Sequence, residues 1–357
     1  MNKLDKDYCN LLQDILENGV EKDTRNGKVL SVFGRSIRYN FKDGKFPLLT
    51  TKKMYWKGIC TELLWFLQGR TDLRYLLEND CHIWTGDAYR FYLDDKDFDA
   101  EHPPFSAPYP KRLTQKEFEE KIMADDVFNG MYGNLGKIYG HSWRNWNDSI
   151  DQISDLINRL KENPDSRRLL VSAWNPSDSP HQVLPPCHYG FQVYTRELSW
   201  EEQVQWVMKN TNVEWENLYI VEEIAKPSTP KRAISLMFSM RSNDVPLGMP
   251  FNLASYGLLL EILGEIVNMV PDELIANLGD AHIYLNQIDG VKEQLTREPF
   301  ELPSLRINTE FWPTKSGECG VGELTDDIDF LIKEMQIEDF QIENYKSHPP
   351  IKIPLSN

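Results

Sequence analysis

The chain has 357 residues, of which 41% are hydrophobic and 26% are charged. This composition is typical of a folded globular protein rather than a disordered chain, and the length allows a sizeable core. The formal net charge of −16 disfavours broad electrostatic attraction to nucleic acid or to an anionic membrane. We therefore expect neither as a partner, and an anionic ligand would need local arginines.

The N-terminal sequence contains no apolar segment of the signal-peptide kind. The most apolar stretch, 256–270, carries two glutamates, and we expect it to be too short to cross a bilayer. The five cysteines are scattered and follow neither a CxxC pattern nor zinc-site spacing, which predicts reduced thiols and no metal site. These features together predict a soluble protein of the cytoplasm.

The first part of the chain predicts helices and a strand. Apolar residues at helical spacing predict an amphipathic helix over 4–18. Alternating apolar and polar residues predict a half-buried strand over 29–39. The nearly apolar stretch 59–67 predicts a buried helix that carries one acidic residue, Glu62. A carboxylate in such a helix needs either structural hydrogen bonds or a role in proton transfer.

Two acidic segments, 92–128 and 196–230, are predicted to be surface insertions, and the low hydrophobicity of the first argues against a core role. Between and after them we expect the following elements: a helix over 151–161, strands over 169–174, 191–194 and 233–240, and a buried helix over 256–269. No repeat or linker is visible. We therefore expect one α+β domain spanning 1–357.

Cys187 lies in LPPCHYGFQ, where two prolines stiffen the chain before the thiol and His188 follows it. A cysteine taken alone is more often a small buried hydrophobe than a nucleophile. Nearby arginines would lower the thiol pKa and favour the reactive thiolate. Arg241 and the pair Arg167 and Arg168 are candidates, although each is also compatible with an ordinary solvated surface or turn.

Polar residues near the second buried helix are equally ambiguous. Asn252 in MPFNLASY offers one acceptor and a donor pair that match the N3–H and O4 edge of uracil, or it could cap a helix. Asp280 and His282 in LGDAHIY have no single interpretation either. Ser242 follows Arg241 and could donate a hydrogen bond beside it.

Recognisable blocks follow one another along most of the chain: FPLLTTKK, ELLWFLQG, IW, YGNLGKIYG, DSRRLLVSAWNP, LPPCH, RSND with LGMPFNLASY, LGDAHIYLNQ, REPFELPSL and NYKSHPPIK. In this order, from about Asp23 to the last residues, they resemble the thymidylate synthase family. The resemblance implies a mixed β-sheet covered by helices on one face. It also implies a homodimer formed sheet to sheet.

The resemblance implies that Cys187 attacks C6 of dUMP and that 5,10-methylenetetrahydrofolate donates a one-carbon unit to C5. The other residues it implies for catalysis are Glu62, Tyr139, His188, Asn252 and Asp244. Those it implies for the nucleotide are Arg25, Arg241, Ser242, Asn252, His282 and Tyr284, with Arg167 and Arg168 donated across the dimer. Those it implies for reduced folate are Lys52, Trp84, Asp87, Leu184, Asp244, Leu247, Gly248, Phe251 and Asn357.

The chain departs from the family pattern at several of these places. The family's Asp-Arg-Thr-Gly is Asp-Thr-Arg-Asn at 23–26, so Arg25 reaches the phosphate only if the loop shifts. Asp87 stands where the family has a second tryptophan, and Met240 where it has glutamine. Asn357 replaces a terminal valine or isoleucine.

These departures bear on what happens to the reaction intermediate that carries an exocyclic methylene group on C5 of the pyrimidine. Hydride from tetrahydrofolate gives dTMP and dihydrofolate, which is the reaction of a thymidylate synthase and our main expectation. Water gives 5-hydroxymethyl-dUMP, as in the phage-type hydroxymethylases, and such an enzyme would work in the host cytoplasm. An inactive relative that binds nucleotide or RNA is a non-enzymatic alternative.

Overall fold

The computed structural model describes residues 2–42, 44–95, 112–178, 182–211, 219–317, 319 and 322–356. Its helices and strands are, in chain order, α1 (Lys3–Asn18), β1 (Val20–Thr24), β2 (Gly27–Asn40), α2 (Trp56–Leu67), α3 (Leu73–Glu78), α4 (Thr85–Leu93), α6 (Gln115–Ala124), α7 (Asp126–Tyr132), α8 (Tyr139–Arg144), α9 (Gln152–Glu162), β3 (Leu170–Ser172), β4 (His188–Glu197), α10 (Trp200–Asn210), α11 (Tyr219–Ala225), β5 (Arg232–Asp244), α12 (Gly248–Val267), β6 (Val270–Tyr284), η2 (Leu285–Gln287), α13 (Ile288–Leu295), β7 (Ser304–Ile307), α14 (Ile328–Glu334), η3 (Ile337–Asp339) and β8 (Phe340–Glu343).

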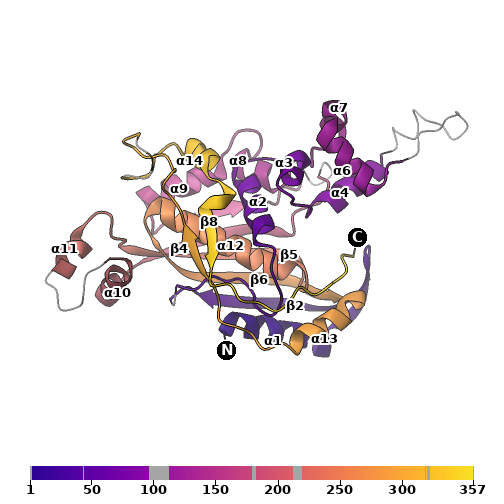
Figure 1. Ribbon diagram of the computed structural model, residues 1–357, viewed down its shortest axis with the longest axis horizontal. Helices are drawn as coiled ribbons and strands as arrows, with labels where there is room; N and C mark the ends of the chain where they lie inside the picture. Colours follow the sequence, from indigo (N-terminus) through magenta and orange to yellow (C-terminus); the bar gives the residue numbers. More distant parts are fainter. Residues whose placement is uncertain are drawn as a thin grey trace, which may run out of the picture.

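A six-stranded sheet in the order β1-β2-β6-β5-β4-β3 forms the centre of the fold. Its strands β5 and β6 are parallel, and the other neighbouring pairs are antiparallel. Helix α12 packs on both β5 and β6, and α1 packs on β2. Figure 1 shows these helices and α2 in front of the sheet. The expected α+β class, with a mixed sheet covered by helices, is confirmed.

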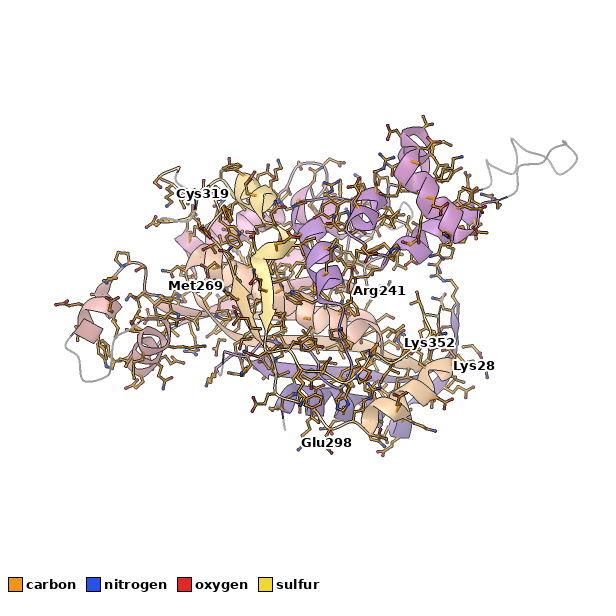
Figure 2. The ribbon with its side chains drawn as sticks, in the orientation of Figure 1. Lys28, Arg241, Met269, Glu298, Cys319 and Lys352 are labelled. Atoms are coloured by element: carbon orange, nitrogen blue, oxygen red, sulfur yellow. The ribbon has the colours of Figure 1, made fainter. Side chains whose placement is uncertain are left out.

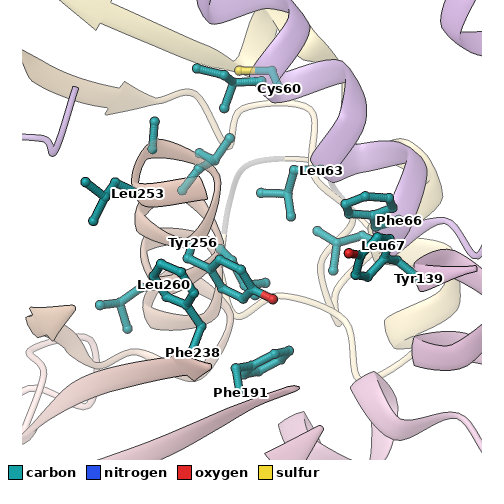
Figure 3. Close-up of a cluster of buried hydrophobic side chains, with 14 of the residues drawn as sticks. Cys60, Leu63, Phe66, Leu67, Tyr139, Phe191, Phe238, Leu253, Tyr256 and Leu260 are labelled. Carbon is teal, nitrogen blue, oxygen red and sulfur yellow. The ribbon is translucent and has the colours of Figure 1, made fainter. Parts of the chain in front are cut away.

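The core lies between α2, α12 and the sheet, as Figure 3 shows. Rings from the sheet and from α12 meet there, since Phe238 and Tyr256 stack at 4.2 Å between centroids. The predicted helices over 4–18, 59–67 and 151–161 are present. The predicted strands over 29–39 and 233–240 are present as well.

Helix α12 begins earlier than predicted and is 20 residues long. It therefore contains most of a stretch that we expected to be too short for a membrane span. By length and composition alone it could cross a bilayer, but 67% of its most apolar window is buried within the fold. Burial on this scale is typical of a core helix that is hydrophobic all round.

The opposite face of the sheet keeps large apolar side chains exposed. Phe33 of β2 is 79% exposed, Tyr194 of β4 66% and Leu170 of β3 58%. Phe33 and Tyr189 line the same hollow in this face. Apolar surface of this kind often marks a protein interface. The homodimer itself stays a prediction.

The expectation that low hydrophobicity keeps segment 92–128 out of the core was wrong for its helical end. A capping box of Thr114 and Glu117 starts α6, and this helix buries Phe118 and Ile122 completely. The Phe118 ring lies 5.7 Å from that of Phe128 on α7, between centroids. A few aromatic residues on one helical face suffice for this packing, whatever the mean composition of the segment. Residues 96–111 lie outside the described part.

The described residues of the second predicted insertion, 196–211 and 219–230, include a small apolar cluster of their own. Val204 and Val207 of α10 and Ile220 and Ile224 of α11 make a cluster separate from the main core. Figure 1 shows α10 and α11 projecting from one end of the sheet. Both the insertion and the single-domain organisation stay predictions.

Glu261 is a half-buried carboxyl on α12, in the middle of the apolar helix. Burial and, to a smaller extent, the neighbouring Glu265 raise its pKa from 4.5 to about 7, although Lys209 of α10 acts in the opposite direction. In the unfolded chain this carboxyl ionises near its ordinary value. Folding is therefore opposed at high pH, where the folded protein must hold the ionised form.

We expect Glu261→Gln to raise the free energy of unfolding at pH 8 by on the order of 1 kcal/mol, and much less at pH 5. The reason is that the pKa of Glu261 is about 7 in the folded protein, so the carboxyl is largely protonated at pH 5 and charged at pH 8. Denaturant unfolding at both pH values measures the difference. The exposed Glu298→Gln is the control, and an equal gain at both pH values in Glu261→Gln would contradict the explanation.

Candidate active site

Cys187 lies immediately before β4, and its sulfur is 3.9 Å from Nη2 of Arg241. The Arg241 side chain donates hydrogen bonds of 2.8 Å to the carbonyl oxygens of Pro185 and Pro186. The backbone N–H of Arg241 donates to the Cys187 carbonyl at 2.8 Å. Four hydrogen-bonding contacts from one residue therefore hold the thiol and the guanidinium together.

Burial raises the pKa of the Cys187 thiol above its ordinary value of 9.0, while Arg241 lowers it and Asp87 raises it. The expectation that nearby arginines would lower this pKa is thus correct for the effect of Arg241 and wrong for the net shift. The guanidinium partly offsets the cost of a buried thiolate.

A β-bulge sets the direction of the chain after Cys187. His188 pairs with Met240, whereas Gly190 pairs with Ser239, so β4 has one extra residue at Tyr189. A bulge bends the strand and re-aims its side chains. Tyr189 is exposed and His188 is buried.

His188 belongs to a buried network of two tyrosines. Its Nδ1 lies 2.7 Å from the Tyr256 hydroxyl, and its ring stacks on that of Tyr139 at 4.0 Å. The Tyr139 hydroxyl in turn accepts a hydrogen bond of 2.8 Å from the Cys187 backbone N–H. Burial lowers the pKa of His188 to about 3, so the imidazole is neutral at pH 7. The network positions the thiol without placing a cationic histidine beside it.

Glu62 on α2 accepts a hydrogen bond of 2.8 Å from the indole N–H of Trp84, the residue before α4. Burial raises the pKa of Glu62 to about 7, and the hydrogen bond from Trp84 acts in the opposite direction. The Trp84 and Tyr139 rings lie 6.0 Å apart between centroids, which links Glu62 to the surroundings of Cys187. A carboxyl that titrates near neutral pH can both take up and release a proton.

Asp87 on α4 forms an ion pair with Arg90. Burial raises its pKa, whereas the charges of Arg90 and Arg25 lower it. Arg25 is exposed in the turn between β1 and β2, and the altered loop keeps its charge close enough to lower the pKa of Asp87. Its reach to a phosphate stays a prediction.

The ends of β5 and β6 carry the next group of candidates. The parallel register pairs Ser242 with Asp280 and Asp244 with His282. The Nδ1 atom of His282 lies 3.1 Å from Oδ1 of Asp280, which also accepts 2.8 Å from the hydroxyl of Ser31. The two strands thus bring residues far apart in sequence to one edge, and Tyr284 ends β6 there.

Asp244 connects the start of α12 to the C-terminal segment. It accepts hydrogen bonds of 3.1 Å from the Leu247 N–H and 2.9 Å from the Gln287 amide. The Gln287 amide also donates to the Pro354 carbonyl at 3.1 Å. The Asn26 amide between β1 and β2 donates to the Ser356 carbonyl at 3.2 Å, so this segment runs beside the β1–β2 hairpin, where Figure 2 labels Lys352 and Lys28. Asn357 lies outside the described residues.

The remaining predicted site residues differ in how deeply they are buried. Lys52 is only 6% exposed and its ammonium donates to the Pro246 carbonyl, with a pKa that burial lowers to about 8. Its expected contact with folate stays a prediction. Leu184 and Phe251 are partly buried against the core, and Gly248 begins α12. Arg167 and Arg168 are exposed, shortly before β3.

Sequence reasoning missed three polar residues near these groups: Tyr256, Asn243 and Gln287. A tyrosine inside an otherwise apolar helix could have signalled a buried hydroxyl with a partner. Neither Asn243 nor Gln287 has such a signal, since their partners are set by the sheet and by the C-terminal segment. Within the described ranges, no three His, Cys, Asp or Glu side chains lie close enough to hold a metal ion.

Comparison with known proteins gives one family. The family model described as thymidylate synthase matches residues 6–357. A protein named thymidylate synthase from Malacoplasma penetrans (strain HF-2) is 38% identical over 348 residues, which cover 97% of this chain and 98% of the relative. A thymidylate synthase from Listeria monocytogenes serotype 4a (strain HCC23) is 35% identical over 367 residues, covering 98% and 99%. With this agreement along nearly its whole length, the chain belongs to the thymidylate synthase family and is an enzyme of one-carbon transfer.

Proposed function

We propose that this enzyme converts dUMP and 5,10-methylenetetrahydrofolate into dTMP and dihydrofolate. The observation that carries the proposal is the Cys187 thiol held 3.9 Å from the Arg241 guanidinium. Relatives named thymidylate synthase support this reading over the hydroxymethylase alternative. We place the activity in the cytoplasm.

Cys187 is the nucleophile in this proposal. Its thiolate forms a bond to C6 of the uracil ring, and the ring electrons move toward C5 and O4. The methylene carbon leaves folate N10 to give an iminium on N5, and C5 bonds to that carbon. C5 then loses its proton while the bond between the methylene carbon and N5 breaks, which leaves an exocyclic methylene group on C5. Hydride from the folate reduces the methylene group to methyl, and the C6–S bond breaks. The covalent adduct divides one difficult substitution into easier steps.

Glu62 is the proton-transfer group. Because burial raises its pKa to about 7, it can donate near O4 and accept again at working pH. The Tyr139 hydroxyl holds the Cys187 backbone by accepting a hydrogen bond of 2.8 Å from its N–H, and the His188 ring stacks on the Tyr139 ring. Their role is positional.

The nucleotide phosphate is bound by arginines in this proposal. Arg241 and Ser242 supply contacts from β5, and Arg25 reaches in from the β1–β2 turn. Arg167 and Arg168 come from a second subunit across the exposed sheet face. A guanidinium offers paired N–H donors to phosphate oxygens, which a chain of net charge −16 needs locally.

Asn252 reads the N3–H and O4 edge of the uracil, with Asp244 nearby. His282 and Tyr284 bind the deoxyribose hydroxyl. Their place at the ends of β5 and β6 and at the start of α12 supports these roles, because it gathers donors and acceptors around one edge of the sheet.

Reduced folate packs between the nucleotide and the C-terminal segment in this proposal. Leu184, Leu247 and Phe251 are partly buried and offer apolar surface to it. Trp84 is the tryptophan of this proposed folate site. Asp87 provides a carboxylate where a family tryptophan would stack. The Asn26 amide donates to the Ser356 carbonyl at 3.2 Å, so the C-terminal segment already lies over the hairpin that carries Arg25. Closure of this segment would exclude water.

We expect Cys187→Ser to lower kcat by roughly a thousandfold or more, because a serine hydroxyl is a far weaker nucleophile than a thiolate. The assay follows dTMP by chromatography and dihydrofolate by absorbance. Cys319→Ser is the matched control, since Cys319 is exposed and Figure 2 shows it well away from Arg241. Formation of 5-hydroxymethyl-dUMP without dihydrofolate would refute the synthase reaction, and so would the absence of any product from the wild-type enzyme.

Glu62→Gln should lower kcat by about 10² to 10⁴ with little change in dUMP affinity. The pH profile is the sharper measurement. Because Glu62 has a raised pKa of about 7, the wild-type kcat should show an ionisation near pH 7 that Glu62→Gln lacks. Glu298→Gln should keep the wild-type profile, and an ionisation that persists in Glu62→Gln would assign it to another group.

If Arg167 and Arg168 act in the active site of the partner subunit, two inactive variants should restore activity when their subunits are mixed. Arg167→Ala with Arg168→Ala, and Cys187→Ser, should each be nearly inactive as homodimers. After subunit exchange, half of the dimers are mixed and each has one intact site, so activity should return to about a quarter of the wild-type value. No recovery, with exchange verified by differently tagged subunits, would place these arginines in the same subunit as the thiol.

A further inference from the structure

The side chain of Asn243 lies between Met240 and Asn252. It is 2% exposed, and its Nδ2 donates to the Met240 sulfur at 3.0 Å and to Oδ1 of Asn252 at 3.4 Å. Its own Oδ1 is buried and has no hydrogen-bond partner within the described part of the chain. Gly248 packs against this pair, because a Cβ there would lie 3.6 Å from Oδ1 of Asn252 and 3.8 Å from Nδ2 of Asn243.

The chemistry of Met240 fixes which way the Asn243 amide points. A thioether sulfur can accept a hydrogen bond and cannot donate one. The NH₂ end of Asn243 must therefore face Met240, which is itself only 3% exposed. The same NH₂ end faces Asn252, so the nearer end of the Asn252 amide must be its oxygen.

The direction of the Asn252 amide decides which pyrimidine it matches. Uracil presents a donor at N3 and an acceptor at O4, whereas cytosine presents an acceptor at N3 and a donor at N4. An asparagine amide fits either pattern if it is free to turn over, since turning exchanges its oxygen and NH₂ ends. The Asn252 oxygen has a second lone pair, so it can accept from Asn243 and from uracil N3–H together.

We propose that Asn243 is a positioning residue that selects uracil over cytosine by fixing the direction of the Asn252 amide. The inference rests on the proposed role of Asn252 at the base edge. Turned for cytosine, the Asn252 NH₂ would face the NH₂ of Asn243, and two donors would oppose each other in a buried site. Leaving such a group unpaired costs more than the hydrogen bond itself contributes.

Two features of this sequence act together in this selection. Met240 stands where the family pattern has glutamine, and a glutamine could either donate to Asn243 or accept from it. Such a residue would leave Asn243 free to turn. The thioether removes that freedom, because it can only accept a hydrogen bond. Met240 therefore fixes the direction of the Asn243 amide, and Asn243 in turn fixes the direction of the Asn252 amide.

The test compares dUMP and dCMP on variants of Asn243. Binding of each nucleotide is measured by calorimetry without folate, and kcat/KM for each is measured with it. Asn243→Asp keeps the shape of the side chain and removes its donor, and Asn243→Ala removes the amide. Both should reduce the preference for dUMP over dCMP by about tenfold or more, chiefly because dCMP binding improves relative to dUMP.

Asn210→Ala is the matched control, because its exposed amide donates to the Trp206 carbonyl on α10. It should leave the preference unchanged. A merely structural role of Asn243 would weaken the binding of dUMP and dCMP equally. An unchanged ratio of dUMP to dCMP affinity in Asn243→Asp would therefore overturn the proposal. Failure of the proposed function looks different, since the wild-type enzyme would then neither bind dUMP nor form dTMP.

Discussion

The hydrogen bonds from Arg241 to the two proline carbonyls before Cys187 are the contacts on which the rest of the site depends. They tie β5 to the loop that enters β4, and they keep a permanent positive charge 3.9 Å from the sulfur. An arginine suits this task because it stays charged when partly buried and because its planar group can serve several acceptors at once. The same residue is proposed to meet the phosphate, so nucleotide binding and thiol activation share one side chain.

Burial then sets the protonation state of the groups around this contact. It raises the pKa of Glu62 to about 7 and lowers that of His188 to about 3. The carboxyl is therefore ready for proton transfer, while the imidazole stays neutral and structural. The Cys187 thiol is also disfavoured as a thiolate by burial, which Arg241 opposes. One environment thus assigns different tasks to neighbouring groups, because burial favours the neutral form of each, which is the protonated carboxyl and the unprotonated imidazole.

Much of the fold could be predicted from pattern. The amphipathic helix α1 and the apolar helix α2 follow from hydrophobic periodicity, and the strands follow from alternation. The packing of α6 was missed because mean composition hides a few aromatic residues that share one face. The burial of Lys52 was missed as well, since its partner is the carbonyl of Pro246, far along the chain. Local pattern carries no information on such partners.

By itself, the sequence determined the order of the elements, the stiff Pro-Pro-Cys segment and the family to which the chain belongs. Only the tertiary structure decided which polar side chains meet. Tyr139 reaches the Cys187 N–H, and Trp84 reaches Glu62, through strand register and helix packing. The bulge at Tyr189 fixes which side of the sheet the side chains of β4 next to Cys187 face. The parallel pairing of β5 with β6 does the same for the polar side chains at the ends of those two strands. A shift of one residue would send these side chains to the other face, which is why the site exists only in the folded chain.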